Sequence, residues 1–400
     1  MSPKVLIIGA SGFIGSNLLK EFERQSIEVR ACSRHPQDIF SEEETTELSF
    51  LDLEDVESIE RNLNGVTTIY YLAHAMGYGK DKFSEKEKAQ AQNLAGLLNE
   101  AHKLIYLGGI ARDDELSEHL QSRKTVGEIF RKTKAKTIEF QASIVIGKGS
   151  ASFEMIRALV YRLPFIVSAE WAHALCQPIA LKDVVTYLTL AQEKKFRKKH
   201  SVFEIGGSDQ LTYRELLVEF SKHEKLFRPE IKLQKFPKDL AIEIMKIVIP
   251  EYVEVGAKLL GSIEIPTTVK DNTALEKFEF TPISFRESLE LAQDTPLKEI
   301  EFSEILNRLK GHPEIPSYLA GQTLQLSFTY RELKGLDKIA QRFKLHDIVK
   351  EHSIKIPFAG ELKITNNEER ELVNLAYRPK YFFQALGWSF FERVAREIKK

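Results

Sequence analysis

The sequence predicts an α/β protein with a doubly wound parallel sheet, a small substrate region after the sheet, and a small α+β domain in the last hundred residues. Through the first 145 residues, short runs of β-branched and aromatic residues alternate with helix-length segments. A glycine-rich turn, GASGFIG at residues 9–15, stands directly between the first such run and the first amphipathic segment. The 400 residues are 43% hydrophobic and 29% charged, which is typical of a folded protein with more than one domain.

Six apolar runs are expected to form the strands of the sheet. They lie at residues 4–10, 28–33, 47–53, 68–74, 103–109 and 136–147. Helical patterns follow the first, third, fourth and fifth runs, at residues 15–25, 54–63, 86–101 and 116–132. Strands that alternate with helices need crossover connections, which place helices on both faces of a parallel sheet.

Beyond Gly149 the pattern changes to longer helical segments. Helices are expected at 151–162 and 183–194, and a strand-like run at 201–207 precedes a helix with Thr212 as its N-cap. We expect these segments to pack at the carboxyl edge of the sheet, where a substrate would bind.

The last hundred residues form a separate α+β pattern after a boundary at 294–302. Strands are expected at 322–330, 352–358, 360–365 and 371–377. A hairpin tip is expected at Asn366 and Asn367, and apolar residues at spacings of three and four from Phe383 to Ile398 predict a closing amphipathic helix. The expected domains are 1–150, 151–295 and 296–400.

Charge and cysteine content argue against several classes of protein. The 57 Lys and Arg residues nearly balance the 58 Asp and Glu residues, so no overall charge favours nucleic acid as a partner. The two cysteines, Cys32 and Cys176, are too few for a disulfide framework and are expected as packed thiols. The sequence has no apolar span of transmembrane length, so a cytoplasmic protein is expected. No metal is expected, because no residues have metal-ligand spacing. The expected partner is a small-molecule substrate. Aromatic residues at 381–391 allow peripheral membrane contact, but their helical spacing favours burial; the oligomeric state stays open.

Gly9, Gly12 and Gly15 form a G-x-x-G-x-x-G spacing between a strand and a helix. A glycine-rich turn directly after a strand and directly before a helix is typical of the Rossmann dinucleotide-binding fold. Gly9 would allow a tight turn, Gly12 would let a pyrophosphate approach the backbone, and Gly15 would let the helix pack close to the strand. The predicted ligand is therefore a dinucleotide, rather than none, because the turn lies within a series of strand and helix alternations.

Neighbouring residues are expected to complete the cofactor site. The backbone of Phe13 and Ile14 lies at the helix start, where N–H groups bind phosphate, and the hydroxyl of Ser11 would add a contact. About 20 residues after the loop, where an acidic residue would select NAD, the chain has Ser33 and Arg34. A guanidinium and a hydroxyl can bind a 2′-phosphate, so the pair predicts NADP, with NAD as the alternative. An arginine that contacts only solvent is the other interpretation.

Residues after the third and fourth strands are further candidates. Asp52, next to Leu53, can accept from an adenine amino group or can cap the next helix, and both interpretations stay open. Ala73 and His74 follow the fourth strand, where a nicotinamide ring would lie. His74 is a candidate proton donor because histidine titrates near neutral pH, although a lone histidine is more often structural.

An ordered series of motifs resembles the short-chain dehydrogenase/reductase superfamily, in its extended or atypical branch. The series comprises GASGFIG, LDL at 51–53, YLAHAMG at 71–77, VIGKGS at 145–150, PIALKDVV at 178–185, VFEIGGSDQLTYREL at 202–216 and FTPISFRESLELA at 280–292. The resemblance is strongest to bacterial NAD(P)-binding proteins related to the NmrA-like regulators and to the nucleotide-binding accessory subunit of respiratory complex I. Such proteins often continue into a START-like domain, so the resemblance implies that the tail is a reduced version of one.

The resemblance also shows that two catalytic groups are missing. Enzymes of this superfamily use a tyrosine and a lysine on one helix and an upstream serine. Alignment on Lys124 and Glu128 places Leu120 at the tyrosine position and Gly109 at the serine position, and neither residue can transfer a proton. Lys124 would bind the ribose, as the resemblance implies, or form an ion pair with Glu128.

Two functions are therefore expected for an NAD(P)(H)-binding protein of this kind. The first is an NADP-dependent oxidoreductase or epimerase-like enzyme that uses a displaced acid such as His74, with Tyr78 close behind it. The second is a non-catalytic redox sensor or an assembly subunit, which the missing tyrosine and serine favour slightly. His119 is expected to point elsewhere on its helix.

Overall fold

The computed structural model describes most of the first 292 residues and four strands of the tail. The described residues are 4–74, 83–111, 116–163, 165–226, 228, 230–233, 236–292, 308, 324–329, 353–356, 360–367 and 372–379. The chain divides into two compact units that interleave along the sequence. The first unit comprises Met1–Phe153, Leu175–Leu211 and Ile265–Gln293; the second comprises Glu154–Ala174, Thr212–Glu264 and Asp294–Lys400.

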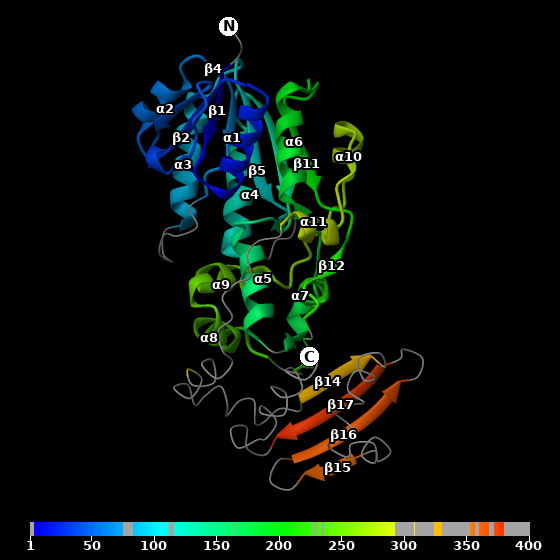
Figure 1. The fold of residues 1–400 in the computed structure, drawn as a ribbon. Coiled ribbons are helices and arrows are strands. Elements are labelled where there is room, and N and C mark those ends of the chain that lie inside the picture. Colours follow the sequence, from blue (N-terminus) through cyan, green and yellow to red (C-terminus); the bar gives the residue numbers. More distant parts are fainter. Residues whose placement is uncertain are drawn as a thin grey trace. The chain divides into compact units, whose positions relative to one another are not determined.

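A seven-stranded parallel sheet forms the centre of the first unit (Figure 1). Its spatial order is β11-β6-β5-β4-β1-β2-β3. The strands are β1 (Lys4–Ile8), β2 (Val29–Ser33), β3 (Thr46–Phe50), β4 (Val66–Tyr71), β5 (Lys103–Gly109), β6 (Lys136–Ala142) and β11 (His200–Ile205). The order reverses between β1 and β4, as in a doubly wound fold.

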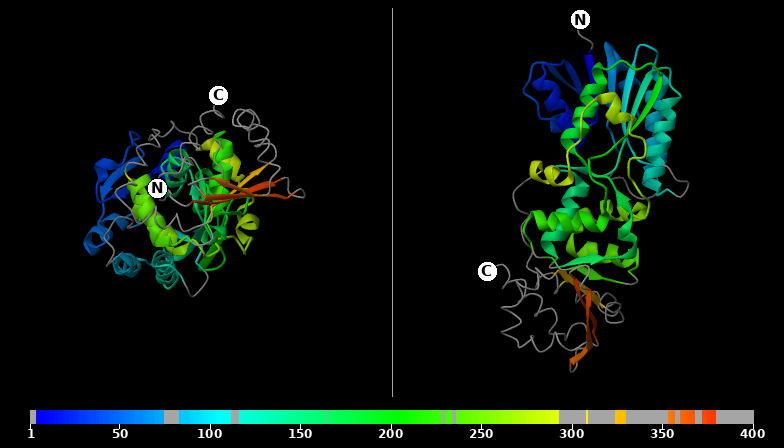
Figure 2. Two further views of the ribbon diagram at one scale, coloured as in Figure 1. Left: turned by 90° about the horizontal axis from the view of Figure 1, so that it is seen from below. Right: turned by 90° about the vertical axis from the view of Figure 1, so that its right-hand side faces the viewer.

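Helices cover both faces of this sheet, as the two further views of Figure 2 show. They are α1 (Phe13–Arg24), α2 (Val56–Leu63), α3 (Phe83–Leu97), α4 (Glu118–Arg131) and α6 (Leu181–Glu193). Val5 and Ile7 of β1 belong to the core beneath α1 and α6, whereas Leu6 and Ile8 belong to the core beneath α2, α3 and α4. This alternation follows from the two-residue period of a strand. The predicted doubly wound α/β fold is confirmed.

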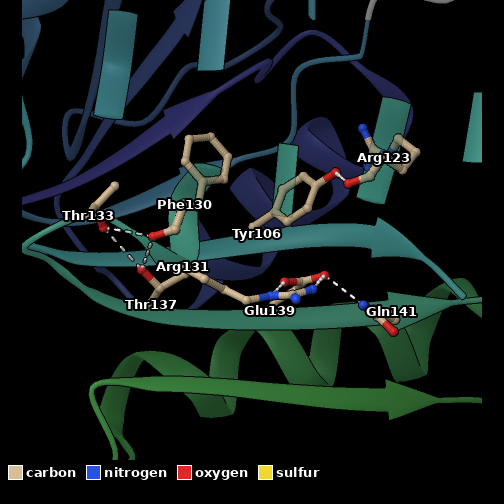
Figure 3. A network of polar contacts seen from close by, with 8 residues as sticks. All are labelled: Tyr106, Arg123, Phe130, Arg131, Thr133, Thr137, Glu139 and Gln141. Atoms are coloured by element: carbon tan, nitrogen blue, oxygen red, sulfur yellow. Dashed lines mark hydrogen bonds and ion pairs between the residues drawn. The ribbon is translucent and has the colours of Figure 1, made fainter. Parts of the chain in front are cut away.

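Buried polar contacts anchor α4 to the sheet (Figure 3). Glu139 of β6 is 1% exposed, and it accepts from both Nε (2.8 Å) and Nη2 (3.1 Å) of Arg131. The amide nitrogen of Gln141 donates to the same carboxylate, at 2.7 Å. At the end of the helix, the hydroxyls of Thr133 (2.8 Å) and Thr137 (3.1 Å) donate to the carbonyl oxygen of residue 130. These bonds satisfy groups that a helix end would otherwise leave unpaired.

Shorter elements complete the first unit. They are η1 (Pro36–Asp38), β7 (Val145–Ile146), β9 (Leu175–Cys176), β10 (Ile179–Ala180), α10 (Thr273–Phe278) and α11 (Phe285–Leu291), and β12 (Leu211–Thr212) follows β11. The single strand expected at 136–147 is wrong, because β6 ends at Ala142 and β7 pairs instead with β10. Cys32 and Cys176 are buried free thiols, as expected; burial raises the pKa of Cys32 to about 12.

The second unit contains helices and a six-stranded sheet. The helices are α5 (Ala151–Arg162), which begins in the first unit, η2 (Glu170–His173), α7 (Tyr213–His223), α8 (Lys238–Val248), η3 (Pro250–Tyr252) and α9 (Val253–Ser262). Thr212 caps α7 as predicted: its hydroxyl accepts from the Glu215 N–H at 3.1 Å, and the Glu215 carboxylate accepts from the Thr212 N–H at 2.8 Å.

The sheet of the second unit has the order β15-β16-β17-β14-β13-β8. Its strands are β8 (Ile166–Ser168), β13 (Glu230–Lys232), β14 (Leu324–Thr329), β15 (Ser353–Ile356), β16 (Gly360–Asn367) and β17 (Leu372–Pro379). The four antiparallel strands expected in the tail are confirmed. The expected tip is wrong, because Asn366 and Asn367 still pair with Val373 and Leu372. The predicted closing helix lies outside the described residues.

No helix among the described residues is long and apolar enough to cross a bilayer.

The separation of residues 296–400 as a domain of its own stays a prediction.

Candidate functional site

A cavity of about 500 Å³ opens at the carboxyl ends of β1, β2 and β4, where the strand order reverses. Its lining residues are Ile8, Gly9, Ser11, Gly12, Phe13, Ile14, Cys32, Ser33, Arg34, Leu51, Leu53, Leu72, Ala73, His74 and Gln90. In open α/β sheets, this crevice is where ligands bind. Residues far apart in the sequence, from the glycine loop to His74, thus surround one space, as the sequence predicts.

Gly9 and Gly15 give the loop its shape. Gly9 has a φ of +88°, a conformation that side chains rarely adopt, and its N–H donates to the Cys32 carbonyl at 3.1 Å. A Cβ on Gly15 would lie 2.2 Å from the Gly9 carbonyl oxygen and 2.9 Å from the Cα of Ala10. The helix therefore packs against the strand end as the glycine spacing predicts.

The first turn of α1 leaves donors at the mouth of the cavity. Gly12 is the N-cap, no side chain caps the helix, and no acidic residue stands in the first turn. The N–H groups of Phe13, Ile14 and Gly15 have no intrahelical acceptor, and the helix dipole adds partial positive charge there. This end of the helix can bind an anion such as a phosphate.

Polar groups gather at the end of β2. The Ser11 and Ser33 hydroxyls are 2.9 Å apart, and the Ser33 oxygen also accepts from the His35 N–H at 3.1 Å. Arg34 is exposed and lines the cavity. Near it, a hydrogen bond from Lys86 is the main cause that lowers the pKa of Glu54, and the charge of Arg34 adds to this effect.

Asp52 does not cap the following helix, which corrects one of its two interpretations. The N-cap of α2 is Asp55, whose carboxylate accepts from the Glu57 N–H at 3.0 Å. Asp52 instead accepts from the N–H of Glu54, two residues on, at 3.0 Å. Among the described residues, Asp52 does not line the cavity, whereas Leu53 does.

His74 belongs to a polar cluster that sequence reasoning missed. Its Nδ1 lies 2.6 Å from the Glu87 Oε1, and the Ser122 hydroxyl donates to the other carboxylate oxygen. The Arg123 Nη1 is 3.5 Å from the same His74 nitrogen, and Nη2 donates to the carbonyl oxygen of Leu107. Burial alone would raise the pKa of Glu87, which is 3% exposed, but the bond and charge of His74, the charge of Arg123 and the Ser122 hydroxyl lower it to about 2.

The positions of the missing catalytic groups lie against each other. A Cβ on Gly109 would be 3.2 Å from the Leu120 Cδ2, and Leu120 is buried. Hydrocarbon therefore fills the place where the resemblance puts serine and tyrosine. The ring of His119 lies 5.0 Å from that of His74, so the expectation that His119 points elsewhere is wrong.

Lys124 lies on α4, half-buried. Lys124 does not line the cavity. It forms no ion pair with Glu128 among the residues that the structure describes, so the ion-pair interpretation is wrong. Its contact with a ribose stays a prediction. Tyr78 lies outside the described residues.

Comparison with known proteins agrees with this geometry. The model of the NAD dependent epimerase/dehydratase family matches residues 5–104. The chain is 24% identical over 273 residues to the chloroplastic divinyl chlorophyllide a 8-vinyl-reductase of Arabidopsis thaliana, covering 62% of this chain. The match spans 63% of the length of the plant protein.

Solved structures show the same fold at low identity. A nucleoside-diphosphate-sugar epimerase from Staphylococcus aureus aligns with a TM-score of 0.58 and 11% identity, over 72% of this chain and 99% of its own. UDP-glucose 4-epimerase from Thermotoga maritima aligns with a TM-score of 0.53 and 15% identity, over 72% and 97% of the two chains. The family model over residues 5–104 and the shared fold are consistent with the resemblance to the extended or atypical short-chain dehydrogenase/reductase proteins.

Proposed function

We propose that this chain is an NAD(P)(H)-dependent oxidoreductase with a preference for NADP(H). The observation that carries the proposal is that the mouth of α1 and His74 line one and the same cavity. The family whose model matches is NAD dependent, which supports a dinucleotide as the ligand.

The residues around the cavity fit a dinucleotide. The first-turn N–H groups of α1 would bind the pyrophosphate, and the space that Gly9 and Gly15 leave free of side chains lets it approach the backbone. The apolar side chains of Leu51 and Leu53 would contact the adenine ring. The segment from Leu72 to His74 would lie at the nicotinamide end. Bound NADPH would supply a hydride there.

Cofactor choice would depend on the charges at the adenosine end. Arg34 and the Ser33 hydroxyl would bind a 2′-phosphate. The carboxylate of Glu54, which lies nearby, is a negative charge that would repel a phosphate. Lys86 (2.5 Å) and Gln90 (3.2 Å) both contact it. Lys86 thereby offsets the repulsion that Glu54 would exert on a phosphate.

Substitution of Arg34 tests this preference. Calorimetry on Arg34→Ala should show NADPH binding about 10- to 100-fold weaker, because a charge-assisted hydrogen bond is lost, while NADH binding changes less than threefold. Arg286→Ala, at an exposed arginine outside the cavity, should bind both cofactors as the wild type does. Unchanged NADPH affinity in Arg34→Ala would show that the NADP assignment is wrong.

His74 is the proposed proton donor, because it lines the cavity and the usual tyrosine position holds Leu120. A substrate that accepts a hydride at carbon needs a proton at the neighbouring atom, so the substrate class is a polarised double bond. The plant relative is by name a reductase of a vinyl group, which adds conjugated alkenes to carbonyl compounds in this class. Lys124 would contact the ribose, as in the family.

A second function is favoured by the apolar contact between Leu120 and Gly109. A protein that binds NADPH but transfers no hydride would act as a redox sensor or an assembly subunit. NADPH oxidation, followed by absorbance with a panel of carbonyl and vinyl compounds, separates the two. Turnover that His74→Phe abolishes supports the oxidoreductase, and tight binding without turnover across the panel supports the sensor.

A further inference from the structure

The cluster around His74 joins three separate elements. His74 follows β4, Glu87 lies on α3, and Ser122 and Arg123 lie on α4. Glu87 is the common partner, because one carboxylate oxygen contacts His74 Nδ1 at 2.6 Å and the other accepts from the Ser122 hydroxyl. A carboxylate held at both oxygens has a fixed orientation.

Burial of this cluster has a free-energy cost that its hydrogen bonds and charges must offset. Glu87 and Ser122 are 3% and 1% exposed, and they lie where α3 packs on α4, beside an otherwise apolar core. An ionised carboxylate in such a place needs full hydrogen bonding and charge compensation. Arg123 and His74 supply that compensation, and the ring of His119 lies 5.0 Å from that of His74.

The ionised state of Glu87 decides which nitrogen of His74 carries a proton. An ionised carboxylate can only accept, so the nitrogen that faces it, Nδ1, must be the donor. The proton that His74 exchanges with a cavity ligand then belongs to the other nitrogen, Nε2. A carboxylate behind a histidine has this orienting role in many enzymes on unrelated folds.

We infer that Glu87 is the positioning residue of His74: it holds the Nδ1–H tautomer and so assigns proton transfer to Nε2. This inference rests on the proposed function, because it gives the tautomer a use. In the reduction of a carbonyl, a hydride from NADPH would go to carbon and the Nε2 proton of the His74 imidazolium to oxygen. The products would be an alcohol, NADP⁺ and neutral His74 with its Nδ1–H retained by Glu87, and solvent would return the proton to Nε2.

Nitrogen NMR of the full chain tests this directly without a known substrate. With ¹⁵N-labelled histidine, His74 is assigned among the ten histidines by the signal lost in His74→Gln. In the wild type at pH about 8, His74 should show the Nδ1–H tautomer. In Glu87→Gln the two ring-nitrogen shifts should move toward each other, as two exchanging tautomers average. Glu85→Gln, at an exposed residue of the same helix, should leave both shifts unchanged.

Each outcome bears on the inference. An Nε2–H tautomer in the wild type overturns it whatever the variants do, and so does an unchanged pattern in a folded Glu87→Gln. If circular dichroism shows that Glu87→Gln is unfolded, Ser122→Ala replaces it. This variant should move the same two ring-nitrogen shifts by a smaller amount, and unchanged shifts would overturn the inference. A calorimetric titration with NADPH keeps the proposed function separate: a chain that shows the tautomer but binds no NADPH fails only there.

Discussion

At Gly15 the backbone leaves no room for a side chain, since a Cβ would lie 2.2 Å from the carbonyl oxygen of Gly9. This close approach keeps the first turn of α1 at the edge of the cavity. A close fit also occurs at Gly109, where a Cβ would lie 3.2 Å from the Leu120 Cδ2. Individual residues thus shape the site through the space that they leave or fill.

Gly15→Ala should destabilise the chain by about 2–3 kcal/mol, because the helix must move away from the strand end. Gly96, on α3, is the matched control, since a Cβ there would meet nothing within 4 Å. Gly96→Ala should stabilise the chain by roughly 0.5–1 kcal/mol through helix propensity. Urea unfolding measures both changes, and equal effects of the two substitutions would contradict the close packing at Gly15.

Glu87 should make stability depend on acid pH. Burial would raise its pKa, but His74, Arg123 and Ser122 lower it to about 2, against an ordinary value of 4.5. A carboxyl group with a lowered pKa stabilises the folded chain above its unfolded pKa, and this contribution is lost as pH falls through the folded value. We expect on the order of 2–3 kcal/mol at neutral pH, lost progressively between about pH 4.5 and about pH 2.

Urea unfolding of the wild type and Glu87→Gln at several pH values measures this contribution. The variant should be less stable near pH 7, and the difference should shrink as pH falls toward 3. A difference that stays constant over this range would show that the pKa of Glu87 is the same in the folded and the unfolded chain, which contradicts the lowered value.

Among the elements, α3 and α4 carry the polar cluster. The sequence predicted that both helices exist, but it did not predict which of their residues face inward. The helices were expected at 86–101 and 116–132 and run over Phe83–Leu97 and Glu118–Arg131. Within α3 the sequence SEKEKAQAQN has few apolar residues, so periodicity gives no inward face and Glu87 resembles any solvated glutamate. Its burial follows from tertiary packing against α4, which no local pattern encodes.

The ion pair between Arg131 and Glu139 should hold α4 on the sheet. Arg131→Ala leaves the buried carboxylate of Glu139 without its charge partner and should destabilise the chain by about 2–4 kcal/mol. Arg24→Ala removes an exposed pair on α1 and should leave the midpoint of thermal unfolding close to that of the wild type. Thermal unfolding of the two variants checks the contrast, and similar losses would contradict a special role for the buried pair.

At the scale of the whole molecule, the parallel sheet and the place of the site follow from the alternation of strands and helices. Parallel strands end at one edge of the sheet, so the residues after β1, β2 and β4 meet there, and the glycine loop, Ser33, Arg34, Ala73 and His74 were predictable from sequence alone. Asp52 was ambiguous because an aspartate after a strand can accept from several nearby N–H groups, and the structure uses Asp55 as the cap. Gln90 escaped prediction because it reaches the cavity from a helix face.

The proposed function requires that the cavity at the mouth of α1 bind a reduced dinucleotide. A calorimetric titration of NADPH into the full chain, beside the variant Ser11→Glu, tests this requirement. We expect saturable binding at one site in the wild type and about 100-fold weaker binding in the variant, because the added carboxylate repels the pyrophosphate. Ser208→Glu, which adds the same charge outside this cavity, should bind as the wild type does. Absence of NADPH and NADH binding to the wild type, or equal binding to Ser11→Glu, would contradict the claim.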